Sequence, residues 1–150
     1  MKKDRKPDIA IASDHAALDL KKHLVAYLVA RGHDVLDLGP RSKKSVPYPA
    51  YGKKVAEMVA SGGVPLGILI CGTGIGMSIT ANRYPGVRAA LVHDHFTALM
   101  AKAHNNANVL VMGGRVIGPG VAEDAVETWL STRFEGGRHQ DRLDMIDGEC

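Results

Sequence analysis

GILICGTGIG, residues 67–76, joins an apolar run to a glycine-rich turn, with a cysteine at the junction. The run is short and uncharged, which is typical of a strand buried inside a parallel sheet. A short helical pattern follows the turn, up to about Tyr84. Strand, glycine-rich turn and helix in this order make up part of a βαβ unit, so this stretch predicts an α/β fold.

The same alternation continues on both sides of this stretch. The patterns predict strands over 8–13, 33–39, 67–70, 87–92 and 108–112, and helices over 16–30, 50–60, 95–103 and 119–134. Strands that alternate with helices predict one doubly wound, Rossmann-like domain, in which a five-stranded parallel sheet carries helices on both faces. Residues 137–150 are expected to form a C-terminal helical extension of this single domain, which spans 1–150.

Composition and charge narrow the classes of function. Much of the +3 net charge comes from MKKDRK, residues 1–6, which we expect to be a frayed basic tail. No basic stripe interleaved with aromatic residues follows, so nucleic acid is not an expected partner. No apolar segment suits a signal sequence or a membrane span. Two cysteines, Cys71 and Cys150, form no disulfide framework, so we expect a cytoplasmic protein.

Polar residues gather where the predicted strands end. In doubly wound sheets, ligands bind at the carboxyl ends of the strands, near the point where the strand order reverses. The sequences at these ends are Ser13-Asp14-His15, Cys71-Gly72-Thr73-Gly74-Ile75-Gly76, His93-Asp94-His95 and Gly113-Gly114-Arg115, while His104-Asn105-Asn106 precedes the last strand. This concentration predicts a binding site formed by loops at that edge of the sheet.

The glycine-rich turn is compatible with two functions. It resembles a dinucleotide-binding loop, and Asp94 lies at a suitable distance downstream to contact a ribose. However, Met77 stands where the third glycine of that motif belongs, and Pro85 ends the following helix early. Alternatively, the backbone N–H groups of the turn hold a small anion or stabilise negative charge on a substrate oxygen.

Cys71, Asp14 and His15 each admit a structural and a chemical interpretation. Cys71 is either a buried structural thiol or, at a strand end facing a helix N-terminus, a nucleophile or proton-abstracting base. Asp14 and His15 either cap the first helix or take part in the site, and Asp14 is a favourable residue for an N-cap.

Two further groups of residues carry less specific signals. His93 and His95 suggest a metal site, but alternate residues entering a helix diverge and no further ligand set follows, so a structural role is expected. Arg138 and Arg142 lie four residues apart and share one face of a helix. They form either a solvated basic face or a clamp for a phosphate.

Taken together, the motifs resemble the type B ribose-5-phosphate isomerases and the related galactose-6-phosphate isomerase subunits. The resemblance spans nearly the whole chain and is carried by IASDHAA (11–17), Tyr48-Pro49, ILICGTGIGMSITANR (68–83), HNNANVLVMGGRVIG (104–118) and EGGRHQDR (135–142). It implies an aldose–ketose isomerase that acts on a phosphorylated pentose, with no metal and no nucleotide cofactor.

The resemblance also implies roles for individual residues. Cys71 would be the base that moves a proton between C1 and C2, and His104 would open the sugar ring with Asp14 as its partner. Thr73 would orient Cys71 or a substrate hydroxyl group. Substrate binding is implied for His15, Tyr48, Gly72, Gly74, Ile75, Gly76, Asn105, Arg115, Arg138 and Arg142.

A homodimer, often paired into a tetramer, is a further implication, with His104 and Asn105 facing the Cys71 loop across the subunit interface. Three alternatives stay open at this point. The substrate could be another sugar phosphate, such as allose 6-phosphate, galactose 6-phosphate or a tetrose phosphate. The chain could instead be a nucleotide-binding module, or a silent subunit that needs a different partner chain for activity.

Overall fold

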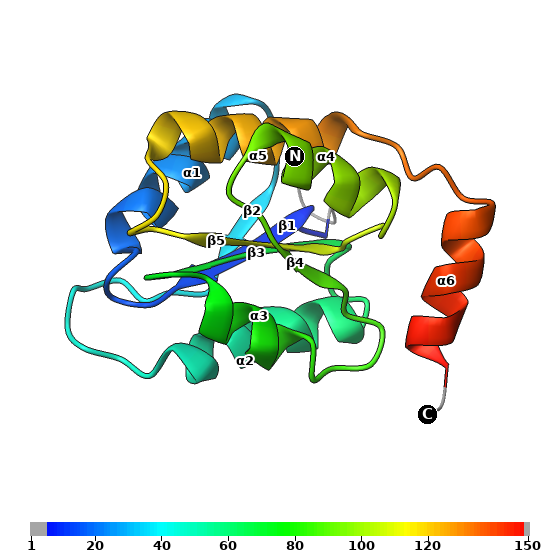
Figure 1. The fold of residues 1–150 in the computed structure, drawn as a ribbon. Coiled ribbons are helices and arrows are strands. Elements are labelled where there is room, and N and C mark those ends of the chain that lie inside the picture. The colour runs from blue at the N-terminus through cyan, green and yellow to red at the C-terminus, as the bar shows by residue number, and fades with distance from the viewer. Residues whose placement is uncertain (1–5, 149–150) are drawn as a thin grey trace.

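The computed structural model of the chain describes residues 6–148 (Figure 1). The strands in this range are β1 (Ile9–Ser13), β2 (Val35–Asp37), β3 (Leu66–Cys71), β4 (Ala89–Leu91) and β5 (Val109–Gly113). The helices are α1 (Leu18–Ala30), α2 (Tyr48–Ala60), α3 (Ile75–Ala81), α4 (His95–Ala103), α5 (Pro119–Ser131) and α6 (Arg138–Asp147). Nearly all of the predicted basic tail, and Cys150, lie outside the described residues.

The five strands form one parallel sheet in the order β2-β1-β3-β5-β4, which confirms the predicted fold class. In register, Ile9 of β1 lies between Val35 of β2 and Leu66 of β3. The chain leaves β1 toward β2 on one side and returns to β3 on the other. The strand order therefore reverses between β1 and β3, and the crevice for a ligand is expected at their carboxyl ends.

Helices cover both faces of the sheet, and two apolar cores result (Figure 1). Ile9 and Ile11 of β1 pack in the core under α1, α4 and α5, which also contains the fully buried Trp129. Ala10 and Ala12 point the other way, into the core under α2 and α3. A strand that is buried on both faces needs apolar residues at every position, which explains the continuous apolar runs in the sequence.

Helix α6 stands apart from the layered domain, beyond the end of the sheet opposite the carboxyl ends of the strands (Figure 1). His139 and Leu143 are its buried side chains, and Arg88 near β4 forms an ion pair with Asp147 at 3.1 Å. Within residues 6–148, no helix combines the length and the hydrophobicity that crossing a membrane requires.

Several helix ends differ from the predicted ones. Helix α1 starts at Leu18 and not at residue 16, because residues 16–17 form a turn. Helix α2 starts at Tyr48, because Pro49 fits the first turn of a helix. Helix α3 stops at Ala81, because the side-chain amide of the next residue, Asn82, exchanges two hydrogen bonds of 2.8 and 2.9 Å with the backbone of Ala89. Helix α5 stops at Ser131, after which the backbone becomes extended.

Candidate active site

A cavity of about 510 Å³ lies at the carboxyl ends of β1 and β3, where the strand order reverses. Its walls come from the turns after β1, β3 and β5 and from the starts of α2 and α3. The lining residues are Asp14, His15, Ala16, Tyr48, Cys71, Gly72, Thr73, Ile75, Gly76, Ile79 and Arg115. Of these, Ala16 and Ile79 were not predicted, although Ile79 follows Ile75 by four residues and so shares its helix face.

Cys71 is the last residue of β3 and is only 5% exposed. Its Sγ accepts a hydrogen bond of 3.2 Å from the backbone N–H of Gly74, which has a φ of +80° and begins α3 as its N-cap. A backbone donor at this distance stabilises negative charge on the sulfur. The thiol also lies in a rigid frame, because Gly114 N donates to Cys71 O at 2.8 Å and Arg115 N donates to Gly72 O at 2.9 Å.

The rest of the glycine-rich turn is held by a hydrogen bond inside the turn and by a contact with the first residue of α2. Thr73 Oγ1 accepts a hydrogen bond of 3.3 Å from Ile75 N. The ring of Tyr48 lies against Gly76 so closely that a Cβ added there would come within 2.4 Å of the ring carbon Cζ. Glycine at position 76 therefore lets the aromatic ring approach the turn and form one wall of the cavity.

Asp14, His15 and Arg115 bring three chemically different groups to the cavity. Asp14 is 8% exposed, and its Oδ1 accepts a hydrogen bond of 3.1 Å from Ala17 N in the turn before α1. The N-cap of α1 is Ala17 itself, so the predicted N-cap role of Asp14 is wrong. His15 Nδ1 accepts a hydrogen bond of 3.1 Å from the backbone N–H of Val46. The Arg115 side chain lies beside Gly72. A carboxylate, an imidazole and a guanidinium thus share the cavity with a thiol.

His104, Asn105, Arg138 and Arg142, which we call the amino-end group, are not among the residues that line this cavity. His104 follows α4 and precedes β5, so it lies where the strands begin. Its ring stacks on that of His139 in α6, with the ring centroids 4.1 Å apart. In Figure 1 the strands run toward α1 and α3, and α6 lies at the other end. One chain therefore divides the predicted site residues between two ends of its sheet.

His104, Glu135 and His139 form the one cluster of potential metal ligands among residues 6–148. The Nε2 atoms of His104 and His139 lie 3.8 and 3.3 Å from Glu135 Oε2. However, an imidazole coordinates a metal through a lone pair in its ring plane, and these rings are stacked with an interplanar angle of only 13°. The two lone pairs do not converge on one point, so this arrangement is a histidine pair sharing a carboxylate and not a preformed chelate.

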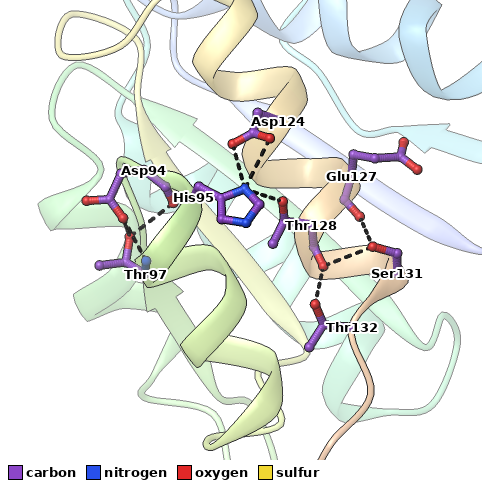
Figure 2. A network of polar contacts seen from close by, with 8 residues as sticks. All are labelled: Asp94, His95, Thr97, Asp124, Glu127, Thr128, Ser131 and Thr132. Atoms are coloured by element: carbon purple, nitrogen blue, oxygen red, sulfur yellow. Dashed lines mark hydrogen bonds and ion pairs between the residues drawn. The ribbon is translucent and has the colours of Figure 1, made fainter.

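The segment around Asp94 has the structural role that the sequence predicted (Figure 2). The backbone N–H and hydroxyl group of Thr97 donate to Asp94 Oδ1 at 2.6 and 2.8 Å, and the backbone hydrogen bond holds the pKa of Asp94 below its ordinary value. His95 Nδ1 contacts Asp124 and Thr128 of α5, each at 3.1 Å. Asp94 thus caps α4 through Oδ1, a structural role that explains its presence without a ribose contact.

A second hollow of about 610 Å³ lies between the connection from α3 to β4 and helix α6. Asn105 is the one predicted site residue on its wall, which also contains Arg88 and Leu143. This hollow is the larger of the two, but it holds no thiol and no buried carboxylate. The chemistry that could move a proton is found in the cavity around Cys71.

Comparison with known proteins identifies relatives that match nearly the whole chain. The Ribose/Galactose Isomerase family matches residues 9–146. The sequence is 46% identical over 138 residues to ribose-5-phosphate isomerase B of Escherichia coli strain K12, covering 92% of this chain and 93% of that protein.

Solved structures of similar proteins have the same fold. The structure of a ribose 5-phosphate isomerase from Thermotoga maritima aligns with a TM-score of 0.92 at 52% identity, covering 95% of this chain and 99% of that one. The structure of ribose-5-phosphate isomerase B from Mycoplasma genitalium with bound ribulose-5-phosphate aligns with a TM-score of 0.90 at 43% identity, covering 93% of each chain.

Proposed function

Because this chain belongs to the ribose/galactose isomerase family and is a sugar phosphate isomerase, we propose that it interconverts ribose 5-phosphate and ribulose 5-phosphate at Cys71. The observation that carries this proposal is the position of the Cys71 thiol. It lies at the switch point of the sheet, accepts a backbone N–H, and shares its cavity with Asp14, His15 and Arg115. The ribulose-5-phosphate bound to the Mycoplasma genitalium relative supports the choice of substrate.

The proposed reaction begins with opening of the sugar ring. His104 donates a proton to the ring oxygen while Asp14 accepts the proton of the C1 hydroxyl group, which leaves an open-chain aldehyde. The Cys71 thiolate then removes the proton from C2, next to the carbonyl carbon, and a cis-enediolate forms. The thiol returns that proton to C1, and the proton of the C2 hydroxyl group moves to O1. C2 thereby becomes the carbonyl carbon and C1 the hydroxymethyl carbon of the ketose.

The negative charge of the enediolate needs donors that are already in place. The N–H groups of Gly74 and Ile75 are committed inside the turn, to Cys71 Sγ and Thr73 Oγ1. We therefore assign this role to other donors of residues 72–76, including the Thr73 hydroxyl group. One preorganised donor of this kind lowers the barrier by about 3 kcal/mol. His15 and Arg115, with Arg138 and Arg142, would hold the phosphate group.

A second copy of the chain would complete each site. The proposal rests on the separation of the amino-end group from the cavity, because His104 cannot protonate a sugar bound beside Cys71 of its own chain from the other end of the sheet. Ile75 and Ile79 on the cavity side of α3 are each 54% exposed, which suits an edge that a partner subunit covers. A homodimer in which the amino-end group of one chain meets the cavity of the other satisfies both observations.

Mixing two inactive variants tests this shared site. Cys71→Ala and His104→Ala homodimers should each be nearly inactive. After subunit exchange, half of the dimers are mixed and each of these has one intact site, so activity should recover to about a quarter of the wild-type value. Native mass spectrometry confirms exchange, and a mixture of Cys71→Ala with Cys71→Ser provides the control without recovery. If mass spectrometry verifies subunit exchange but isomerase activity does not recover, the site is not built from two chains.

Substrate preference tests the choice of ribose 5-phosphate. With the phosphate-binding groups and Cys71 both fixed, a six-carbon sugar phosphate places its C2 one bond too far from the thiol. We expect kcat/KM for ribose 5-phosphate to exceed that for allose 6-phosphate and galactose 6-phosphate by about 10-fold or more, in the presence of EDTA. A higher value for a hexose phosphate would reject the substrate. Turnover only after addition of another chain would identify a silent subunit, and a thermal shift with NAD would support the nucleotide-binding alternative.

A further inference from the structure

At the carboxyl end of β5, a side chain takes the place of the neighbouring strand. Strand β4 pairs with β5 only as far as Leu91, which lies beside Val111, although β5 continues to Gly113. Gly113 is buried, so its backbone N–H needs an acceptor inside the protein. His93 supplies this acceptor, because Gly113 N donates to His93 Nε2 at 3.2 Å.

The ring of His93 is uncharged in this arrangement, and its backbone is held in place. A backbone N–H can only donate, so Nε2 carries no proton and the single proton of the imidazole lies on Nδ1. Strand β4 ends two residues before His93, and the next residue, Asp94, is the N-cap of α4. His93 N also donates to Thr97 Oγ1 at 3.4 Å. The ring therefore starts from a fixed backbone and can hold Gly113 in turn.

Gly113 supports the turn that carries the thiol. It is the register partner of Cys71 in the sheet. Its backbone packs so closely against that of Thr73 that a Cβ added at position 113 would lie 2.8 Å from the Thr73 carbonyl carbon. The two residues after Gly113 donate to Cys71 O and Gly72 O at 2.8 and 2.9 Å. A shift of Gly113 would therefore displace both the thiol and the backbone of the glycine-rich turn.

We infer that His93 is a positioning residue for the proposed isomerisation. It is not among the residues that line the cavity, so it acts on the substrate only through Gly113. Gly113 in turn keeps Cys71 where proton abstraction requires it. Misplacement of a reacting group by about 1 Å can lower a rate by up to about 10²-fold, so a hydrogen bond outside the cavity can affect the chemical step. The inference rests on the proposed function for the role of Cys71 as the base.

Two substitutions with the same amide group test the acceptor at Nε2. Glutamine can place its carbonyl oxygen near the Nε2 position, whereas asparagine is one methylene group shorter and leaves Gly113 N without an acceptor. His93→Asn should lower kcat for ribose 5-phosphate by about tenfold. The inhibition constant of inorganic phosphate should stay within about twofold of the wild-type value, because long arginine side chains can adjust to a small shift. His93→Gln should keep kcat within about threefold of the wild-type value.

His95 provides a matched control two residues further along the chain. Its Nδ1 contacts Asp124 and Thr128 of α5, each at 3.1 Å, and not the end of β5 (Figure 2). His95→Asn should therefore leave kcat at the wild-type value, even where it lowers the free energy of unfolding. If His95→Asn lowers kcat as much as His93→Asn does, a general loss of stability explains both results and the inference is wrong.

Two measurements without substrate test the contact itself. Nitrogen-15 NMR of the ligand-free protein should show the His93 proton on Nδ1. Amide hydrogen exchange at Gly113, Gly114 and Arg115 should be about tenfold faster in His93→Asn than in the wild type, and nearly unchanged in His93→Gln. A proton on Nε2 in the wild type, or equal exchange rates in the asparagine and glutamine variants, would overturn the inference.

The inference and the proposed function can fail separately. A wild-type protein that does not isomerise ribose 5-phosphate, but shows the expected His93 tautomer and exchange rates, would reject the proposed function while supporting the contact between His93 and Gly113. An active isomerase with the same kcat in the wild type and in His93→Asn would reject this inference alone.

Discussion

Cys71→Ala is expected to lower kcat for the isomerisation of ribose 5-phosphate by roughly 10³-fold, which is the range over which a positioned general base accelerates proton transfer. Cys71 is the one thiol among the lining residues, and the N–H of Gly74 donates to its Sγ, so its loss removes the group to which proton abstraction from C2 is assigned. The rate of ribulose 5-phosphate formation is the measurement, with exchange of the C2 proton into deuterated water as a second readout.

A matched measurement separates loss of the base from loss of the site. Because ring opening is assigned to His104 and Asp14, Cys71→Ala should still open the ring, and trapping of the free aldehyde should proceed at the wild-type rate. Cys71→Ser should retain little activity, since a hydroxyl group ionises much less readily than a thiol. If Cys71→Ala keeps more than about a tenth of the wild-type kcat, then another group is the base.

Gly74→Ala is expected to have the largest effect on stability. Gly74 has a φ of +80°, and a Cβ there would lie 2.4 Å from Leu91 Cδ1 and 3.0 Å from backbone atoms of Met112. The left-handed conformation costs a residue with a Cβ about 1–2 kcal/mol, and the clash adds roughly 1–3 kcal/mol to the loss in unfolding free energy. Displacement of the Gly74 N–H from Cys71 should lower kcat as well. Urea unfolding and steady-state kinetics measure the two effects.

Gly86 provides a control with matched backbone geometry. It has the same φ of +80°, but a Cβ added there would meet nothing within 4 Å. Gly86→Ala therefore isolates the conformational cost, and the difference between the two variants measures the close packing around the glycine-rich turn. If both substitutions lower the unfolding free energy equally, the turn can move away from Leu91 and Met112. The backbone around Cys71 would then be more flexible than its contacts indicate.

The fold could be predicted because its signals are local. A strand that is buried on both faces is apolar at each position, and a helix that covers a sheet repeats its apolar residues every three or four positions. Pro119 could be placed in a first turn from its chemistry alone. The end of α3 could not be placed in this way, because it depends on the pairing of Asn82 with Ala89, a contact that only the folded chain brings together.

The site was predictable in its chemistry but less so in its geometry. Doubly wound sheets bind ligands at the carboxyl ends of strands, so Asp14, Cys71 and Arg115 could be expected to converge. The bond between Val46 and His15 left no signal, because it uses a backbone N–H whose partner no residue type reveals. The stacking of His104 on His139 likewise depends on where α6 packs, which the helical pattern of that segment does not determine.

The position of the amino-end group, at the end of the sheet opposite the cavity, restricts the symmetry of any active assembly. A chain whose two ends are complementary to each other can associate head to tail. Such association either closes into a ring or continues as an open filament, whose two terminal chains each keep one unpaired binding surface. A twofold axis avoids this outcome, because each chain then offers its amino-end group to the same neighbour that fills its own cavity. In the proposed homodimer both sites are complete, and neither chain keeps an exposed surface that could bind a third chain. The smallest active assembly would therefore be a dimer with closed symmetry.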